Sequence, residues 1–232
     1  MRKKNLISLS GAVLLLLVSL QALQAQTEYK LGYFDAISVA GNIEVHLVKG
    51  EKESAMLETY GIPEDEVNIS VNRQTLRLSL LNSVFQRSKK VRITVTYTEL
   101  RSVRGNAGAM ITADHILQGD FLEVRAGSGA QVMLEVDANK LEAGATEGGT
   151  LQLRGQVNSQ KAQAATGGLY EAFNLISKNT YARSGTGGQM QVTALEVLDA
   201  YANLGGSIEY KGEPEERYHR KFIGGEVRRV EF

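Results

Sequence analysis

The chain has 232 residues, with 26 basic and 26 acidic side chains, 24 glycines, two prolines and no cysteine. Without cysteine, the chain can form neither structural disulfides nor a lipoprotein attachment. Without residues 1–25, which carry three basic and no acidic side chains, 23 basic side chains face 26 acidic ones, a net charge near −3. This mildly acidic charge argues against nucleic acid and anionic membranes as general partners.

Residues 1–25 have the layout of a secretory signal peptide. A basic start, Arg2 to Lys4, precedes an apolar run from Ala12 to Leu20, and small residues lead to a predicted cleavage site after Ala25. The apolar run falls short of the roughly 20 residues that span a bilayer, which disfavours a membrane anchor as the alternative. We therefore expect an exported protein in the periplasm or at the cell surface or outer membrane. We expect it to be neither a lipoprotein nor membrane-spanning after cleavage.

Residues 26–99 are predicted to form an irregular, strand-rich region. The stretch "FDAISVAGNIEVHLV" alternates apolar and polar residues, and "VNISV", "LRLSLL" and "VRITVTY" follow it. Such alternation indicates strands with one buried face. With Ala40-Gly41 placed at the turn of the repeats described below, Ile43 and Val45 match their buried positions. We expect a longer, less regular coil or small sheet that begins a stack of repeats and is continuous with it.

Residues 100–232 repeat a pair of small residues seven times. The pairs are Gly108-Ala109, Gly129-Ala130, Gly148-Gly149, Gly167-Gly168, Gly187-Gly188, Gly205-Gly206 and Gly224-Gly225, and their first glycines are 21, 19, 19, 20, 18 and 19 residues apart. A period this constant is typical of stacked repeats. A phosphate-binding loop would place its glycines once, before a helix, and a Lys would usually follow. We therefore interpret the pairs as tight corners that need positive φ or a close approach of the backbone.

Apolar residues recur at fixed distances from each pair. Three residues after the first glycine stand Ile111, Val132, Leu151, Tyr170, Met190, Ile208 and Val227. Five residues before it stand Val103, Val124, Ala143, Ala162, Ala182 and Ala200. A third, less regular position comprises Ile116, Val136, Val157, Leu175 and Leu195. The pattern predicts an all-β fold, a parallel β-solenoid of about seven coils, each with about 20 residues in three short strands around a narrow interior.

Two further points complete the predicted fold. Leucine-rich and helical repeats are the competing interpretation, but they require a helical period, and none is visible. The last coil is densely charged, and His219 and Lys221 fall where the alanines should continue. We interpret this coil as a polar cap that keeps open strand edges from pairing with other chains.

The stretches "FDAISVAGNIEVHLVKG" and "LRSVRGNAGAMI", together with the recurring glycine pairs, resemble the family named "putative auto-transporter adhesin, head GIN domain". The resemblance covers nearly all of the chain after the signal peptide. It implies an exported, all-β, solenoid-like domain of Gram-negative bacteria with an adhesin-like role. It brings no catalytic residues with it.

The sequence offers little catalytic or metal-binding chemistry. His46, His115 and His219 are scattered without the spacing of zinc ligands, and Asp114-His115, the only adjacent acid–imidazole pair, falls at a predicted corner. A carbohydrate-active solenoid enzyme would need paired carboxylates on one wall, and it remains an alternative. We expect no enzyme, no cofactor and no metal.

Two outward-facing columns on one predicted wall hold the candidate ligand-binding residues. These residues are Arg104, Arg125, Arg183, Tyr201 and Arg220 in one column and Tyr181 in the other. Arginine forks match carboxylate or sulfate groups, and tyrosine faces stack on sugars. A solvated surface of balanced charges is the alternative. We predict an exported, non-enzymatic, adhesin-like protein that binds a glycan or an envelope protein. A purely structural envelope scaffold that self-associates is a further alternative.

Overall fold

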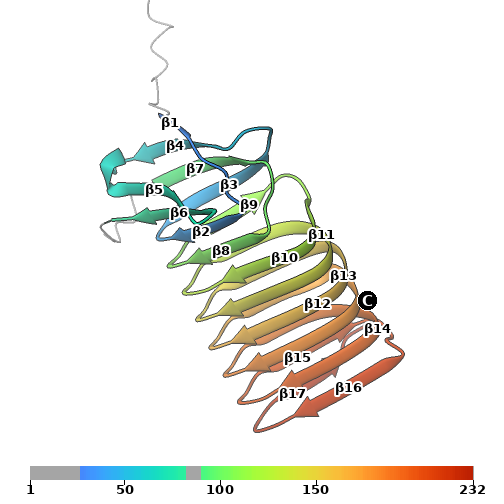
Figure 1. Cartoon of the computed structure of the whole chain (residues 1–232). Coiled ribbons are helices and arrows are strands. Elements are labelled where there is room, and N and C mark those ends of the chain that lie inside the picture. Colours follow the sequence, from blue (N-terminus) through green and yellow to red (C-terminus); the bar gives the residue numbers. More distant parts are fainter. Residues whose placement is uncertain (1–26, 82–89, 232) are drawn as a thin grey trace, which may run out of the picture.

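The chain forms a two-walled β-solenoid (Figure 1), seen in a computed structural model that describes residues 27–81 and 90–231. The predicted signal peptide, residues 1–25, lies outside the described residues. Within the described ranges the only helix is the 3-10 helix η1 (Glu64–Glu66), and no helix there is long and apolar enough to cross a membrane.

Each regular coil is one long bent strand followed by a tight turn. These strands are β11 (Gln131–Thr146), β12 (Thr150–Ala165), β13 (Leu169–Gly185) and β14 (Gln189–Ala202). The first part of each strand lies in one wall, called wall B, and the last part in the other, called wall A. Between the two parts, Asn158 Nδ2 donates to Asn139 Oδ1 at 3.1 Å, and Asn139 Nδ2 donates to Asp120 Oδ1 at 2.9 Å. We call the stacked positions of Asp120, Asn139 and Asn158 the asparagine corner. The strand continues through this corner from one wall to the other, so the prediction of three short strands per coil is wrong.

The other coils of the regular stack use shorter strands. These are β8 (Ser102–Asn106), β9 (Met110–Ala113), β10 (Leu117–Ala126), β15 (Ser207–Lys211), β16 (Glu216–Lys221) and β17 (Glu226–Arg229). Neighbouring coils pair in parallel throughout. Residues 102–229 thus form a solenoid of about seven turns with coils of about 19 residues, which confirms the predicted fold class.

The predicted inward columns are largely confirmed by strand register. Along wall A, Ala143 pairs with Ala162, Ala162 with Ala182 and Ala182 with Ala200, all of them buried. The column that begins at Ile111 is likewise continuous to Val227. Such small side chains let the two walls approach and close-pack with little loss of rotamer entropy.

The third predicted apolar position is wrong at two of its members. Ile116 and Leu195 are exposed, at 42% and 47%, and in the first coil it is Leu117, not Ile116, that is buried and pairs with Val136. A register shift between Ala172 and Ile176 marks an irregularity where β13 meets β14. The segment between tight turn and corner therefore varies in length from coil to coil, and a fixed spacing cannot follow it.

The glycine pairs form seven stacked tight turns. In each, two consecutive residues have positive φ, such as Glu147 at 52° and Gly148 at 71°. The amide of Gly149 donates to the carbonyl of Thr146 at 2.9 Å, which closes a turn of the type I′ pattern. The amide of Gly148 donates to the carbonyl of Thr166 in the next coil at 3.2 Å, so each turn is also bonded to its neighbour.

The second residue of each pair is small for a different reason. A Cβ built on Gly149 would lie 2.5 Å from the carbonyl oxygen of Ala126 in the preceding coil. Gly168, Gly188, Gly206 and Gly225 face the same backbone contact, whereas Ala109 and Ala130 occupy the position in the first two coils. Both predicted reasons for glycine, positive φ and close approach, are therefore present, one at each residue of the pair.

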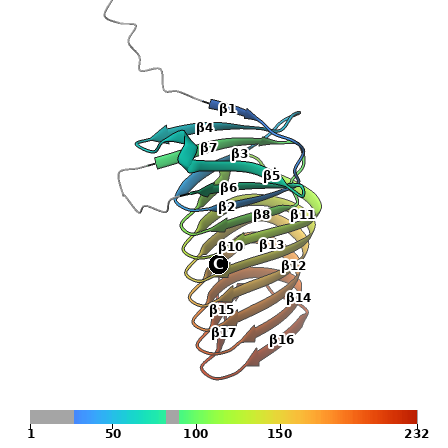
Figure 2. The same ribbon diagram turned by 60° about the vertical axis from the view of Figure 1, so that its left-hand side comes forward.

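The N-terminal strands extend both walls. They are β1 (Thr27–Lys30), β2 (Ala36–Ala40), β3 (Ile43–Lys49), β4 (Ser54–Tyr60), β5 (Val67–Asn72), β6 (Thr75–Leu80) and β7 (Lys90–Tyr97). In wall A, β2 lies parallel between β6 and β8, and in wall B, β3 lies parallel between β7 and β9. The order of coils in the stack therefore differs from their order in the chain. Beyond them, β5 pairs antiparallel with β6, β4 with β7 and β1 with β4, which ends the parallel stack (Figure 2).

The predicted register of this region is wrong by two residues. Val45, not Ile43, pairs with Ile111, and Leu47 pairs with Ala113. Both Ile43 and Val45 are buried, because a slip of two residues leaves the same face of a strand inward.

At the other end of the stack, β16 and β17 are the outermost described strands. His219 continues the column of Ala200, Lys221 that of Ala202, and every residue of β16 is exposed. Charged side chains at inward positions of an edge strand disfavour pairing with a further strand. This arrangement fits the interpretation of the last coil as a cap.

The histidines make separate contacts. Asp114 Oδ2 lies 3.0 Å from His46 Nε2, whereas His115 Nε2 lies 2.5 Å from the hydroxyl oxygen of Tyr97. In residues 27–81 and 90–231, no group of three or more His, Cys, Asp or Glu side chains could hold a metal ion.

The two glycines of one turn should differ in their tolerance of alanine. Gly148→Ala places a Cβ in open space and should cost about 1 kcal/mol through its left-handed backbone. Gly149→Ala forces a Cβ against the Ala126 carbonyl and should cost about 3 kcal/mol, as overpacking does. Urea unfolding of the two variants measures the difference, and equal losses would contradict the close-approach explanation.

Acid should weaken the fold through His115 and His219. Burial lowers the pKa of both imidazoles, and nearby cations, Lys49 at His115 and Arg217 at His219, lower it further. A histidine whose pKa is lower in the folded state opposes protonation there, so stability is full above the unfolded pKa of about 6.5 and falls as pH drops below it. The melting temperature should thus be lower at acidic pH, and His115→Gln should reduce that loss. A variant with the pH dependence of the wild type would show that His115 does not contribute.

Candidate ligand-binding wall

All six predicted binding residues lie on wall A. Arg104, Arg125, Arg183, Tyr201 and Arg220 occupy successive paired positions of one column, together with Gly144 and Gln163, and Tyr181 stands in the adjacent column. Parallel strands in register place equivalent positions about 4.8 Å apart, so the column forms a straight row along the stack. The role of these residues in binding stays a prediction.

At the N-terminal end of the row, one carboxylate, that of Glu123, pairs with two arginines. Glu123 Oε2 lies 2.6 Å from Arg104 Nη2, and Glu123 Oε1 lies 3.3 Å from Arg125 Nε. Burial raises the pKa of Glu123, but hydrogen bonds from Arg104, Ser102 and Arg125 outweigh it and hold that pKa below its ordinary value. Arg125 also lies across Gly144, where a Cβ would come within 2.8 Å of its Nη1. The contacts of Arg125 with Glu123 and Gly144 therefore agree with the alternative interpretation, a solvated surface of paired charges with no ligand.

At the C-terminal end, aromatic and charged side chains alternate in what we call the tyrosine–arginine patch. Its members are Tyr181 and Arg183 of β13, Asp199 and Tyr201 of β14, and Tyr218 and Arg220 of β16. The ring of Tyr201 lies between two guanidinium groups, 5.8 Å from Arg183 and 5.9 Å from Arg220. These distances are in the range of cation–π contacts, which hold the ring in place.

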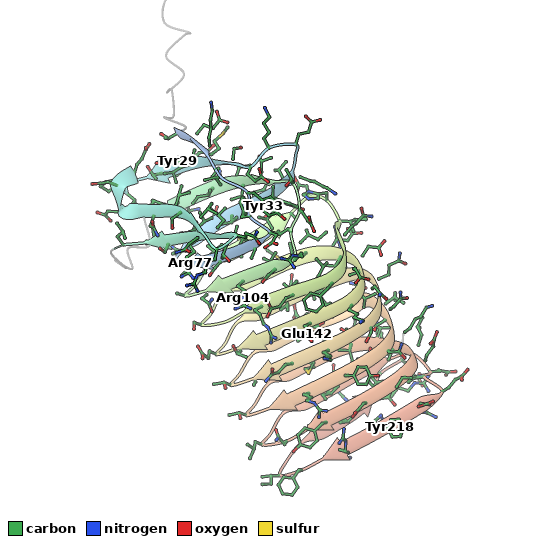
Figure 3. All side chains as sticks on the ribbon, in the orientation of Figure 1. Tyr29, Tyr33, Arg77, Arg104, Glu142 and Tyr218 are labelled. Atoms are coloured by element: carbon green, nitrogen blue, oxygen red, sulfur yellow. The ribbon has the colours of Figure 1, made fainter. Side chains whose placement is uncertain are left out.

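The patch keeps unused binding capacity. Both oxygens of Asp199 accept from Arg220 Nη2, at 2.6 and 2.8 Å, whereas no carboxylate of the described residues pairs with Arg183. Two arginines and one aspartate leave a net charge of 2 − 1 = +1. Tyr181 and Tyr218 are 40% and 55% exposed, and Figure 3 labels Tyr218 on the last strand of this wall. The patch can therefore offer to a ligand its exposed tyrosine rings and the guanidinium of Arg183, which contacts the Tyr201 ring but has no carboxylate partner among the described residues.

Wall B carries a groove that sequence reasoning did not predict. Its volume is about 560 Å³, and Phe173 lies along it. The polar side chains there already bond one another, Arg154 with Glu135 at 3.0 Å and Gln152 with Glu171 at 2.5 Å. Mutual pairing makes this groove a weaker candidate than the patch.

Sequence reasoning also missed Tyr218 and Arg77 as binding candidates. The repeat spacing does place Tyr218 in the column of Tyr181, as the strand register shows, but Tyr218 was not chosen as a binding residue. Arg77 joins the column of Arg104 because β2 lies between β6 and β8. No repeat spacing in the chain signals that position.

Comparison with known proteins places the chain in a family. Residues 33–214 match the family described as "Putative auto-transporter adhesin, head GIN domain". A search of curated proteins found no match.

Solved structures share the fold. A putative adhesin from Bacteroides fragilis NCTC 9343 has 23% identity and a TM-score of 0.80, over 89% of this chain and 96% of that one. Putative adhesins from Parabacteroides distasonis ATCC 8503 and Parabacteroides merdae ATCC 43184 have 16% and 18% identity and TM-scores of 0.73 and 0.69, with the same coverage. At these identities the likeness concerns the fold alone. Because the family match spans most of the chain, from β2 through β15, the protein belongs to the auto-transporter adhesin head GIN domain family.

Proposed function

We propose that the protein is an exported, non-enzymatic, adhesin-like protein of the Gram-negative cell envelope, and that it binds a glycan through the tyrosine–arginine patch. Membership of an adhesin family and the layout of residues 1–25 support export and an adhesin-like role. The observation that carries the binding proposal is the alternation of exposed tyrosines with Arg183, which has no carboxylate partner among the described residues.

The patch suits a sugar ligand for physical reasons. Its backbone is held by parallel pairing on both sides at β14, so the side chains stand on a rigid surface. Tyrosine provides a large contact area with little loss of rotamer freedom and a hydroxyl that bonds a polar ligand. The Arg183 fork would add a charge-assisted bond to a carboxylate or sulfate group of the glycan.

A glycan fits this surface better than a protein partner. A stable protein interface buries about 800 Å² on each partner and draws on about 20–30 residues a side. The patch consists of six side chains on three strands, which is closer to the footprint of a short oligosaccharide.

Removal of Tyr201 should impair binding without unfolding the protein. On a glycan panel, the exported wild-type chain should retain at least one oligosaccharide, and Tyr201→Ala should lose at least about tenfold in affinity, or about 1.4 kcal/mol. The melting temperature should stay near that of the wild type, because Tyr201 alternates with the buried Ala200 and Ala202 and so lies on the outer face of its strand.

Tyr33→Ala is the matched control, since Tyr33 is 47% exposed and lies in the N-terminal region (Figure 3). Equal affinity of Tyr201→Ala and wild type would refute the role of the patch. Retention by protein partners in place of glycans would refute the ligand class, and turnover of a polysaccharide would refute a non-enzymatic role. Protease treatment of intact cells separates surface from periplasmic location.

A further inference from the structure

A hollow at the N-terminal end of wall A brings together three arginines that are distant from the tyrosine–arginine patch. In wall A the strand order β6, β2, β8 places Arg77, Ser38 and Arg104 at equivalent positions of adjacent strands. With strands about 4.8 Å apart, the backbones of the two arginines lie about 10 Å from each other, with the small Ser38 between them. Figure 3 shows Arg77 and Arg104 on the same face of the stack.

The small residue between the arginines creates space. A hollow of about 430 Å³ opens over β2, and its lining includes Ser38, Thr75, Arg77, Arg101, Ser102 and Arg104. Thr75, Ala36 and Ser102 form the adjacent column, so hydroxyl groups stand beside the arginines. The lining therefore includes guanidinium and hydroxyl groups that donate hydrogen bonds, beside the carboxylates of Asp35 and Glu123.

Positive charge is in excess in the hollow. Asp35, which is buried, accepts from Arg101 Nε at 3.0 Å, and Glu123 accepts from Arg104 at 2.6 Å. Among the described residues no carboxylate pairs with Arg77, so the lining carries 3 − 2 = +1. The ion pair with Glu123 occupies one terminal nitrogen of Arg104, which leaves other N–H groups of its guanidinium for a ligand.

We propose that this hollow is an oxyanion-binding site for the carboxylate or sulfate group of an acidic glycan. The Arg77 fork binds two oxygens of the anion from one side, and the free donors of Arg104 approach from the other. Hydroxyls of Ser38 and Thr75 add neutral hydrogen bonds, whereas the Ser102 hydroxyl already donates to Glu123. Arg104, the residue of this site nearest the patch, lies four strand spacings, about 19 Å, from Arg183, so the site does not depend on the proposed role of the patch.

Titration with small anions at constant ionic strength tests the site. The probes are inorganic sulfate, galacturonate oligomers and a sulfated disaccharide, and binding is followed by calorimetry and by chemical shifts of wall A amides. We expect the wild-type chain to bind, and Arg77→Ala to lose about tenfold or more in affinity. Arg77→Lys should recover only part of it, because a lysine keeps the charge and loses the fork. The melting temperature of Arg77→Ala should not change, since no described carboxylate loses a partner.

A second variant separates shape from charge. Ser38→Leu keeps all three arginines and fills the hollow between them, and it should abolish binding. Arg73→Ala removes an exposed cation four residues from Arg77 and should leave binding unchanged, as should Tyr201→Ala at the other end of the wall. Preference for galacturonate or for the sulfated sugar identifies the source of the anion. Absence of binding to the wild type, or equal losses in Arg73→Ala and Arg77→Ala, would overturn the proposal.

Discussion

The fold depends on one constraint: each coil must lie one strand spacing from the next along the whole stack. The constraint is most severe at the tight turns, where Gly149 lies against the Ala126 carbonyl and Gly148 bonds to the next turn. Once the turns are in register, strands of nearly equal length bring equivalent residues into columns. The interior accepts alanine where the walls are close, and the exterior becomes a set of straight rows.

The features that this spacing requires, the glycine turns and the inward column of small residues, could be predicted accurately from the sequence. Positive φ and backbone contact are requirements of geometry, so the glycine pairs recur with little variation, and the column from Ala143 to Ala200 follows from their spacing. At the asparagine corner, side chains bond to their neighbours, but no backbone contact of the described residues there restricts the size of the residue as it does at the tight turns. The spacing to that corner varies, and there the predicted positions of Ile116 and Leu195 were wrong.

The N-terminal coils were harder to place for two physical reasons. Alternation with a period of two cannot distinguish registers that differ by two residues, so Ile43 was matched to the column that Val45 occupies. In the sequence, the coil of β2 and β3 comes before β6 and β7, but in the stack it lies between them and the regular coils. Local pattern reveals strands but not the order in which they stack. The arginine pair across Ser38 was therefore beyond the reach of sequence reasoning.

The rows on wall A show why binding capacity concentrates at its two ends. Stacking in register brings like residues together, and like charges directly opposite each other destabilise a sheet. The sequence identified the row of arginines correctly, but it could not show that Glu123 bonds both Arg104 and Arg125. Such charge compensation leaves fewer guanidinium donors for a ligand. It is incomplete at Arg77 and at Arg183, neither of which pairs with a carboxylate of the described residues, and each lies beside groups that suit a sugar or its anion. A long acidic glycan that lies along the stack could contact both places, since one straight wall carries them.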